Sequence, residues 1–165
     1  GSEMCIRDSI RTFYYILVEL TKLRKDDFMY TSKIVVRYAE TDQMGIAHHS
    51  NYPVWFEVAR TDFIKASGIS YTDVEKAGII TPLTGLTVRY KQAAFYEDEL
   101  SIRIKLTRLT PVRLEFSYEV IRENPRALIA TGTTSHGMVG KNLMPVNVKK
   151  EHPEIYRMFE ESLDK

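Results

Sequence analysis

The chain has 165 residues, which is enough for one domain with a sizeable hydrophobic core. Hydrophobic residues make up 44% of it and charged residues 27%, as in ordinary soluble globular proteins, and a net charge of +1 gives no overall attraction to nucleic acid or anionic membranes. The single cysteine, Cys5, excludes an internal disulfide framework and a cysteine-based zinc site, which favours a cytoplasmic protein.

Residues 1–28 differ in character from the rest, and we interpret them as an extension of a domain formed by residues 29–165. Apolar residues at positions 10, 13, 17 and 20 have helical spacing and are followed by basic residues. This pattern is compatible with an amphipathic arm, and equally with a tag or dispensable extension, because Gly1-Ser2 resembles a cloning scar. The longest apolar run, 13–18, is too short for a transmembrane helix, which needs about 20 residues.

A long helix is predicted over residues 52–67, after a short strand over residues 34–38. Asn51 is a favourable N-cap, and Gly68 is suited to end the helix. The residues predicted to form its buried face are Tyr52, Trp55, Phe56, Ala59, Phe63 and Ala66.

Between this strand and this helix, residues 40–45 favour a turn that contains one carboxylate, Asp42. The end of the turn leads directly into the N-terminus of the helix, where backbone N–H groups are free to bind an anion or a polarised carbonyl. From spacing alone, Asp42 either caps the turn or acts chemically, as a nucleophile or a general base.

The residues around this turn also resemble a known family. The matching residues, in order and spacing, are Tyr38, Thr41, Asp42, Gly45, His49, Ser50, Asn51, Tyr52, Phe56, Glu57 and Arg60. They resemble the 4-hydroxybenzoyl-CoA thioesterase-like hotdog family, and most of all its bacterial acyl-CoA thioesterase branch associated with the Tol-Pal cluster. The resemblance covers roughly residues 30–160. It implies hydrolysis of an acyl-CoA thioester without a cofactor other than the coenzyme A of the substrate, and assembly into homodimers or homotetramers.

Downstream, a short helix is predicted over residues 70–77 and a last helix over 154–163. Four strand-like segments lie between them, at residues 79–93, 100–109, 112–120 and 127–139. Strict alternation in the second and third of these is typical of an antiparallel sheet with one buried face, which the helix over 52–67 is suited to cover. The prediction is an α+β fold, an antiparallel five- to six-stranded sheet wrapped around one long central helix, and the resemblance implies the same hotdog fold.

The resemblance implies a catalytic group of Asp42, His49 and Gly45. Asp42 attacks the thioester carbonyl or activates a water, the backbone N–H of His49 stabilises the oxyanion, and Gly45 gives the loop its backbone freedom. The adjacent His48 and His49 are weak grounds for a metal site, because no third ligand stands at a suitable spacing, and no metal is expected.

Candidate substrate-binding residues surround that group. Tyr38, Asn51 and Tyr52 are expected to shape the loop. The candidates for the phosphates of coenzyme A are the basic residues Arg89, Lys91, Arg108, Arg113 and Lys141, although most of them are equally explained as the charged outer face of strands. Glu57 stands three residues before Arg60 on the helix, which favours an ion pair between them over a second active-site acid.

Two other functions remain open at this point. A hotdog dehydratase acting on hydroxyacyl thioesters would use His49 with Glu57 and would leave Asp42 without a purpose. A non-catalytic protein that binds acyl-CoA or acyl-carrier protein would have no need of an acid beside the thioester.

Overall fold

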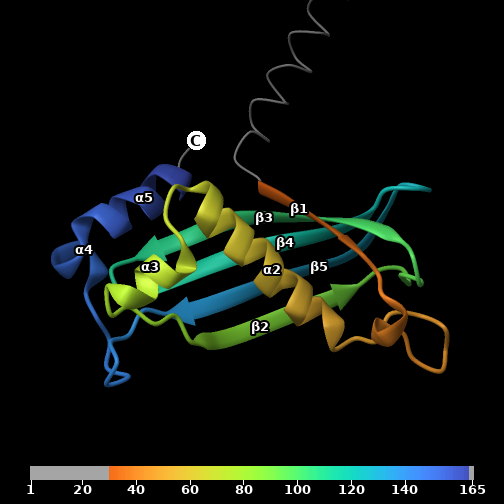
Figure 1. The fold of residues 1–165 in the computed structure, drawn as a ribbon, viewed down its shortest axis with the longest axis horizontal. Helices are drawn as coiled ribbons and strands as arrows, with labels where there is room; N and C mark the ends of the chain where they lie inside the picture. The colour runs from red at the N-terminus through yellow and green to blue at the C-terminus, as the bar shows by residue number, and fades with distance from the viewer. Residues whose placement is uncertain (1–29, 164–165) are drawn as a thin grey trace, which may run out of the picture.

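The computed structural model describes residues 30–163, so the predicted extension over residues 1–28 lies outside the described residues (Figure 1). The elements in chain order are β1 (Tyr30–Val35), the 3₁₀ helix η1 (Tyr38–Glu40), α2 (Asn51–Ala66), α3 (Tyr71–Lys76), β2 (Leu83–Tyr90), β3 (Glu99–Thr110), β4 (Arg113–Arg122), β5 (Ala127–Gly137), α4 (Val148–Glu151) and α5 (Pro153–Leu163). None of the helices in this part of the chain is long and apolar enough to cross a membrane.

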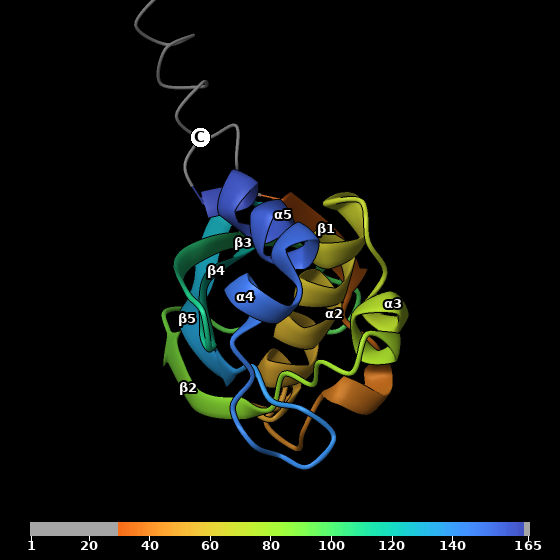
Figure 2. The ribbon, with the colours of Figure 1, turned by 90° about the vertical axis from the view of Figure 1, so that its left-hand side faces the viewer.

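The five strands form one antiparallel sheet in the order β1-β3-β4-β5-β2. Seen from the end, the sheet curls around α2, which lies against its concave face (Figure 2). The predicted α+β architecture, with an antiparallel sheet wrapped around one long helix, is confirmed.

Alternation along the two middle strands decides which side chains meet α2. Ile104 pairs with Tyr118 across β3 and β4, and both side chains are almost completely buried. The residues that share this buried face are Leu100, Ile102, Ile104 and Leu106 on β3 and Leu114, Phe116, Tyr118 and Val120 on β4. The period of two in the sequence therefore predicted the inner face of these strands correctly.

The helix α2 packs on the sheet through aromatic side chains. Phe56 stacks on Tyr118 with ring centroids 4.2 Å apart and an angle of 13° between the planes. Five of the six residues predicted for the buried face of α2 are buried, but Ala66, in the last turn, is exposed and Ile64 is buried instead. The buried stripe therefore shifts near the end of α2.

Several boundaries differ from the prediction. The strand β1 ends at Val35, and Tyr38 lies in η1 rather than in the strand. Arg37, which has an extended backbone, is the N-cap residue of η1. Helix α2 begins at Asn51 itself, with Ser50 in the cap position. The short helix α4 was not predicted; its cap, Asn147, accepts a hydrogen bond from the backbone N–H of Lys150 at 3.1 Å.

Candidate active site

The segment between η1 and α2 forms a tight loop held by its own backbone. The N–H of Asp42 donates to the carbonyl of Ile46 at 3.0 Å, and the N–H of Gly45 donates to the carbonyl of Asp42 at 2.9 Å. Gly45 has a φ of +75°, in the left-handed region that favours glycine, as expected from its place in the turn. Thr41 and Ala47 close the loop as an antiparallel bridge.

The carboxylate of Asp42 takes part in this turn. Its Oδ1 accepts a hydrogen bond from the N–H of Met44 at 2.8 Å, while its other oxygen has no hydrogen-bond partner within residues 30–163. Asp42 therefore caps the turn and still offers one carboxylate oxygen for a second task.

A pocket of about 350 Å³ opens beside the loop that carries Asp42. Its walls come from the loop, from the start of α2 and from the chain that leaves β2. The lining residues are Asp42, Met44, Ile46, Ala47, His49, Tyr52, Tyr90, Lys91, Gln92 and Ala93. Of the residues predicted for the site, the fold thus gathers Asp42, His49 and Tyr52 at one pocket, with Gly45 in the loop between them.

The entrance to α2 leaves one backbone donor without an acceptor. The N–H of His48 donates to the carbonyl of Glu40 at 2.8 Å, and the N–H of Ser50 donates to Nδ1 of His48 at 3.3 Å. Within residues 30–163 the N–H of His49, between them, has no hydrogen-bond acceptor. An unpaired amide at a helix N-terminus, on a residue that lines the pocket, is suited to an oxyanion or a polarised carbonyl.

Two tyrosines form the opposite wall. The rings of Tyr52 and Tyr90 meet edge to face at 4.9 Å, and the Tyr90 hydroxyl donates to the carbonyl of His49 at 3.3 Å. Burial, and to a smaller extent the nearby Tyr90 and Asp98, raises the pKa of Tyr52 to about 12. Tyr52 therefore stays a neutral phenol near neutral pH and shapes the pocket.

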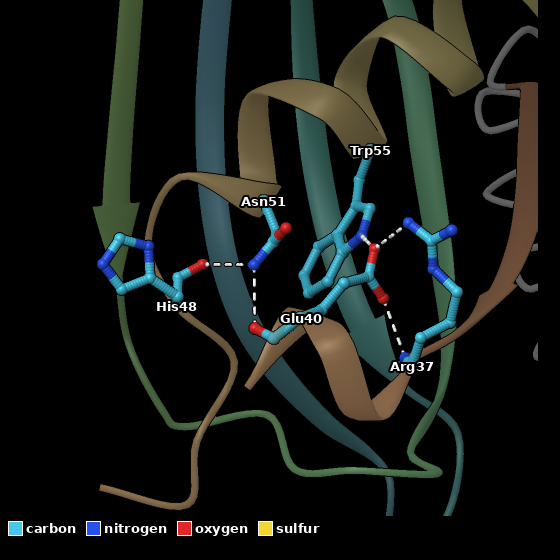
Figure 3. Close-up of polar contacts among 5 residues, drawn as sticks. All are labelled: Arg37, Glu40, His48, Asn51 and Trp55. Carbon is cyan, nitrogen blue, oxygen red and sulfur yellow. Dashed lines mark hydrogen bonds and ion pairs between the residues drawn. The ribbon is translucent and has the colours of Figure 1, made fainter. Parts of the chain in front are cut away.

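Asn51 links the first residue of α2 to the loop through hydrogen bonds. Its side-chain amide donates to the carbonyl of Glu40 at 2.8 Å and to the carbonyl of His48 at 3.1 Å (Figure 3). It does not line the pocket, and its contacts hold the loop in place.

The remaining predicted residues do not line the pocket. Tyr38 is 77% exposed and its ring meets Tyr96 at 5.6 Å, while Glu57 and Arg89 are exposed on α2 and β2. Lys141 belongs to the segment between β5 and α4, which lies at the end of the molecule opposite η1 (Figure 1). The cation that lines the pocket is Lys91, two residues beyond Arg89.

The predicted ion pair between Glu57 and Arg60 is wrong, since these side chains form no ion pair in the part of the chain that the structure describes. Arg60 instead lies near Tyr118 and His136, where its charge offsets part of the rise that burial causes in the pKa of Tyr118. Its Nε is buried and has no hydrogen-bond partner among the described residues.

The sequence interpretation missed several residues that build the site. Met44, Ile46 and Ala47 belong to the loop itself, and Tyr90 continues the wall from β2. Their only sequence signal is proximity to Asp42 and to the end of a strand. Within residues 30–163 no group of three or more His, Cys, Asp or Glu side chains is arranged to hold a metal ion.

The chain is similar in sequence to known thioesterases. The model of the thioesterase-like superfamily matches residues 36–151. YneP of Bacillus subtilis (strain 168), provisionally named an acyl-CoA thioesterase, is 36% identical over 138 residues, which span 81% of this chain and 99% of YneP. The acyl-CoA thioester hydrolase YbgC of Escherichia coli O157:H7 is 26% identical over 86 residues, 52% of this chain and 64% of YbgC.

A solved structure extends the comparison to three dimensions. The crystal structure of the DHNA-CoA thioesterase from Staphylococcus aureus matches with a TM-score of 0.77 and 35% identity, over 81% of this chain and 89% of that chain. This similarity confirms the predicted hotdog fold. Because the family model covers more than half of the chain and YneP exceeds 30% identity over most of it, the chain belongs to the thioesterase-like superfamily.

Proposed function

We propose that this protein hydrolyses acyl-CoA thioesters, with Asp42 as nucleophile or general base and the backbone N–H of His49 as oxyanion donor. The observation that carries the proposal is that Asp42, with one carboxylate oxygen unpaired among residues 30–163, lines the same pocket as His49, whose N–H lacks an acceptor there. The names of the relatives YneP and YbgC support the same activity.

The proposed reaction uses only these groups. Either Asp42 attacks the thioester carbon, or it takes a proton from a water whose oxygen attacks that carbon. Negative charge then develops on the carbonyl oxygen, where the N–H of His49 donates; one such donor is worth about 3 kcal/mol in other enzymes. The C–S bond breaks, and the sulfur of coenzyme A leaves and takes up a proton. When water attacks, the acyl group is released directly as the free acid. When Asp42 attacks, the acyl group stays on the Asp42 carboxylate as an anhydride, which a water then hydrolyses to the free acid and the original carboxylate. Since this chemistry needs no metal or redox group, we expect a chelator to leave the rate unchanged.

Asp42→Asn is the direct test. The amide oxygen of asparagine can still accept the hydrogen bond from the N–H of Met44, so the turn is kept while the charge is lost. We expect release of free thiol from acyl-CoA to fall by at least about 100-fold, since base catalysis typically contributes 10²–10⁴-fold.

Asp73→Asn is the matched control. Asp73 also caps a turn, because its carboxylate accepts the hydroxyl hydrogen bond of Ser70 at 2.6 Å, but it stands in α3 and does not line the pocket. This variant should keep wild-type turnover. Wild-type turnover in Asp42→Asn would refute the assigned role of Asp42.

The acyl group and the phosphate contacts are finer parts of the proposal. The proposed partners of the coenzyme A phosphates are Lys91, which lines the pocket, Arg89, which stands two residues before it, and Lys141, which lies elsewhere on the surface. Short and long aliphatic acyl-CoAs should be compared with DHNA-CoA, the substrate named for the S. aureus relative. Ranking them by kcat/KM assigns the acyl class.

Assembly into homodimers, or dimers paired into tetramers, is a further part of the proposal. The strand β2 is an edge of the sheet, so one side of its backbone has no strand partner within residues 30–163. On α2, Val54 and Val58 are exposed and lie on one face with Thr61, turned away from the buried stripe. An unpaired edge and an uncovered apolar stripe together support pairing with a second copy.

Two more specific assignments also stay proposals. Membership of the Tol-Pal-associated branch rests on the matching residues between Tyr38 and Arg60, and linkage of the gene to Tol-Pal genes would test it. A cytoplasmic location rests on the single cysteine, and cell fractionation would test it.

The dehydratase alternative gains no support from the geometry of one protomer. It needs His49 and Glu57 at the same site, whereas Glu57 is exposed on α2 and does not line the pocket that His49 borders. Dehydration of a hydroxyacyl-CoA without thiol release would nevertheless favour that function, and tight binding of acyl-CoA without any turnover would favour a pure binding protein.

A further inference from the structure

We propose that Glu40 is a positioning residue that holds the Asp42 loop against the N-terminus of α2. The inference rests on the proposed function, because its catalytic consequence passes through Asp42 and His49. Glu40 stands two residues before Asp42 and is only 5% exposed, an unusual place for a carboxylate.

The side chain of Glu40 fastens η1 to the body of the helix. Its Oε1 accepts hydrogen bonds from Nε1 of Trp55, in α2, and from the guanidinium of Arg37, both at 3.0 Å (Figure 3). Its Oε2 accepts the backbone N–H of Arg37 at 2.8 Å. The bond from Trp55 ties the start of the loop to the second turn of α2, and the two bonds from Arg37 hold η1 in place.

The backbone of the same residue fastens the far end of the loop. The carbonyl of Glu40 accepts the N–H of His48 and the side-chain amide of Asn51, each at 2.8 Å (Figure 3). The loop from Thr41 to Ala47 therefore begins and ends at bonds made by one residue. His48, held in this way, immediately precedes the unpaired N–H of His49.

Glu40 is suited to this task because it remains charged. Burial raises the pKa of its carboxyl, but hydrogen bonds from the side chain and backbone of Arg37 and from Trp55 outweigh that effect and lower the pKa below its usual value. A hydrogen bond to a charged group is stronger than one between neutral groups, and a buried partner left unpaired is costly.

The consequence for catalysis is geometric. Asp42 and the N–H of His49 come from opposite ends of the loop, so their separation depends on how firmly both ends are held. A displacement of about 1 Å at a reacting group can cost about 100-fold in rate. Glu40 itself does not line the pocket, and so it acts through Asp42 and His49.

The first test is Glu40→Gln, which keeps the side-chain shape but removes the charge. We expect kcat/KM for an acyl-CoA to fall about 10- to 100-fold. Glu115→Gln, which removes the carboxylate that pairs with Arg108 between β3 and β4, should keep wild-type activity. Phe159→Leu, on the buried face of α5, lowers stability away from the site. If its Tm falls by about as much as that of Glu40→Gln, it too should keep wild-type turnover. If Phe159→Leu loses as much activity, Glu40 is merely structural and the inference fails.

A double variant separates positioning from general support. When Asp42→Asn has already removed the acid, adding Glu40→Gln should lower the residual rate by a smaller factor than it lowers the wild-type rate, because the part of its effect that passes through Asp42 is already lost. Full additivity of the two losses would overturn the inference.

If Glu40→Gln does not fold, Arg37→Met is the second variant, because it removes only the exposed guanidinium donor. It should show the same non-additive loss at smaller size, and wild-type turnover in Arg37→Met would count against the inference.

Two readouts do not depend on turnover. Trp55 is the single tryptophan of the chain, so its emission should shift in Glu40→Gln and stay unchanged in Glu115→Gln. Exchange of the His48 and Asp42 amides should also accelerate in Glu40→Gln, while amides of β4 keep their protection. Unchanged emission and exchange would refute the inference even in an active enzyme. An inactive wild type with accelerated exchange in the variant would refute only the proposed function.

Discussion

His136 is the one histidine buried within the sheet and helix layers of residues 30–163, with an exposed fraction of 1%. Its Nδ1 lies 3.2 Å from the carbonyl of Thr81, and its Nε2 lies 3.0 Å from the hydroxyl of Thr134. A carbonyl only accepts, so the neutral ring donates from Nδ1, and the Thr134 hydroxyl donates to Nε2. Burial, followed by the charge of Arg60, lowers the pKa of His136 to about 4, although the carbonyl of Thr81 acts in the opposite direction.

Stability should therefore fall as the pH is lowered. Between the ordinary histidine pKa of 6.5 and about 4, the unfolded chain binds a proton at this residue that the folded chain does not. The free energy of unfolding should lose up to about 3 kcal/mol from this histidine across that window, and no more below it. Urea unfolding of wild type and His136→Gln from pH 7 to pH 4 measures the contribution as the difference between the two curves.

His152→Gln is the control for this experiment, because His152 lies in the α4–α5 connection outside the core and its Nδ1 is 3.9 Å from Glu154. Its curve should run parallel to that of the wild type. Parallel curves for His136→Gln and wild type would show that His136 does not carry the pH dependence.

At the same scale, the sequence predicted Asp42 but missed Glu40. The acid in the loop was recognisable because it stands in a dense motif that ends at a helix N-terminus. Glu40 gave no such signal, since the role proposed for it depends on burial against Trp55, a contact that exists only in the folded chain. The Glu57–Arg60 prediction failed because the three-residue spacing rule describes exposed helix faces, and Arg60 turns toward the sheet.

Among elements, the contact between α2 and β5 depends on a residue without a side chain. A Cβ at Gly132 would lie 2.5 Å from Cε2 of Phe56 and 2.6 Å from the backbone carbonyl of Thr87. The carbonyl belongs to β2, which pairs with β5, and the ring is stacked on Tyr118, so an added Cβ would displace groups that already make these contacts. Gly132 thus allows α2 to lie close to the sheet.

Gly132→Ala should consequently destabilise the fold by about 1–3 kcal/mol, the usual cost of overpacking a core. Gly137→Ala, in the same strand, is the matched control, because its added Cβ would meet only Thr84 and Val139 at 3.8 Å. Urea unfolding of the two variants should separate them clearly. Equal stabilities would mean that the Phe56 ring and the strands adjust freely.

Elements with many repeats of one pattern were predicted best. The strands β3 and β4 alternate over eight or nine residues, and α2 shows its apolar period over four turns. Short elements were missed or displaced, as η1 and α4 were, because a single turn has too few residues for a period to be visible. Their positions are set by capping bonds to neighbouring loops.

The proposed association of two copies of the chain can be tested through the exposed apolar stripe of α2. Val58→Glu places a charge on the exposed apolar stripe of α2 and should convert the proposed dimer of 19.1 kDa chains into monomers. Leu128→Glu is the matched control: Leu128 is 40% exposed, as is Val58, but lies on β5 rather than α2. Light scattering of both variants gives the mass, and an unchanged dimer in Val58→Glu would place the interface elsewhere.

One wall of the pocket is continuous with an edge of the sheet. The residues from Tyr90 to Ala93 are the direct continuation of β2, which is an edge of the sheet. A second copy docked along that edge, as proposed above, would therefore contact the same stretch of backbone that continues into the pocket wall. If the proposed assembly forms, the shape of the pocket, and with it the preference for an acyl group, would depend on the neighbouring chain as well as on this one.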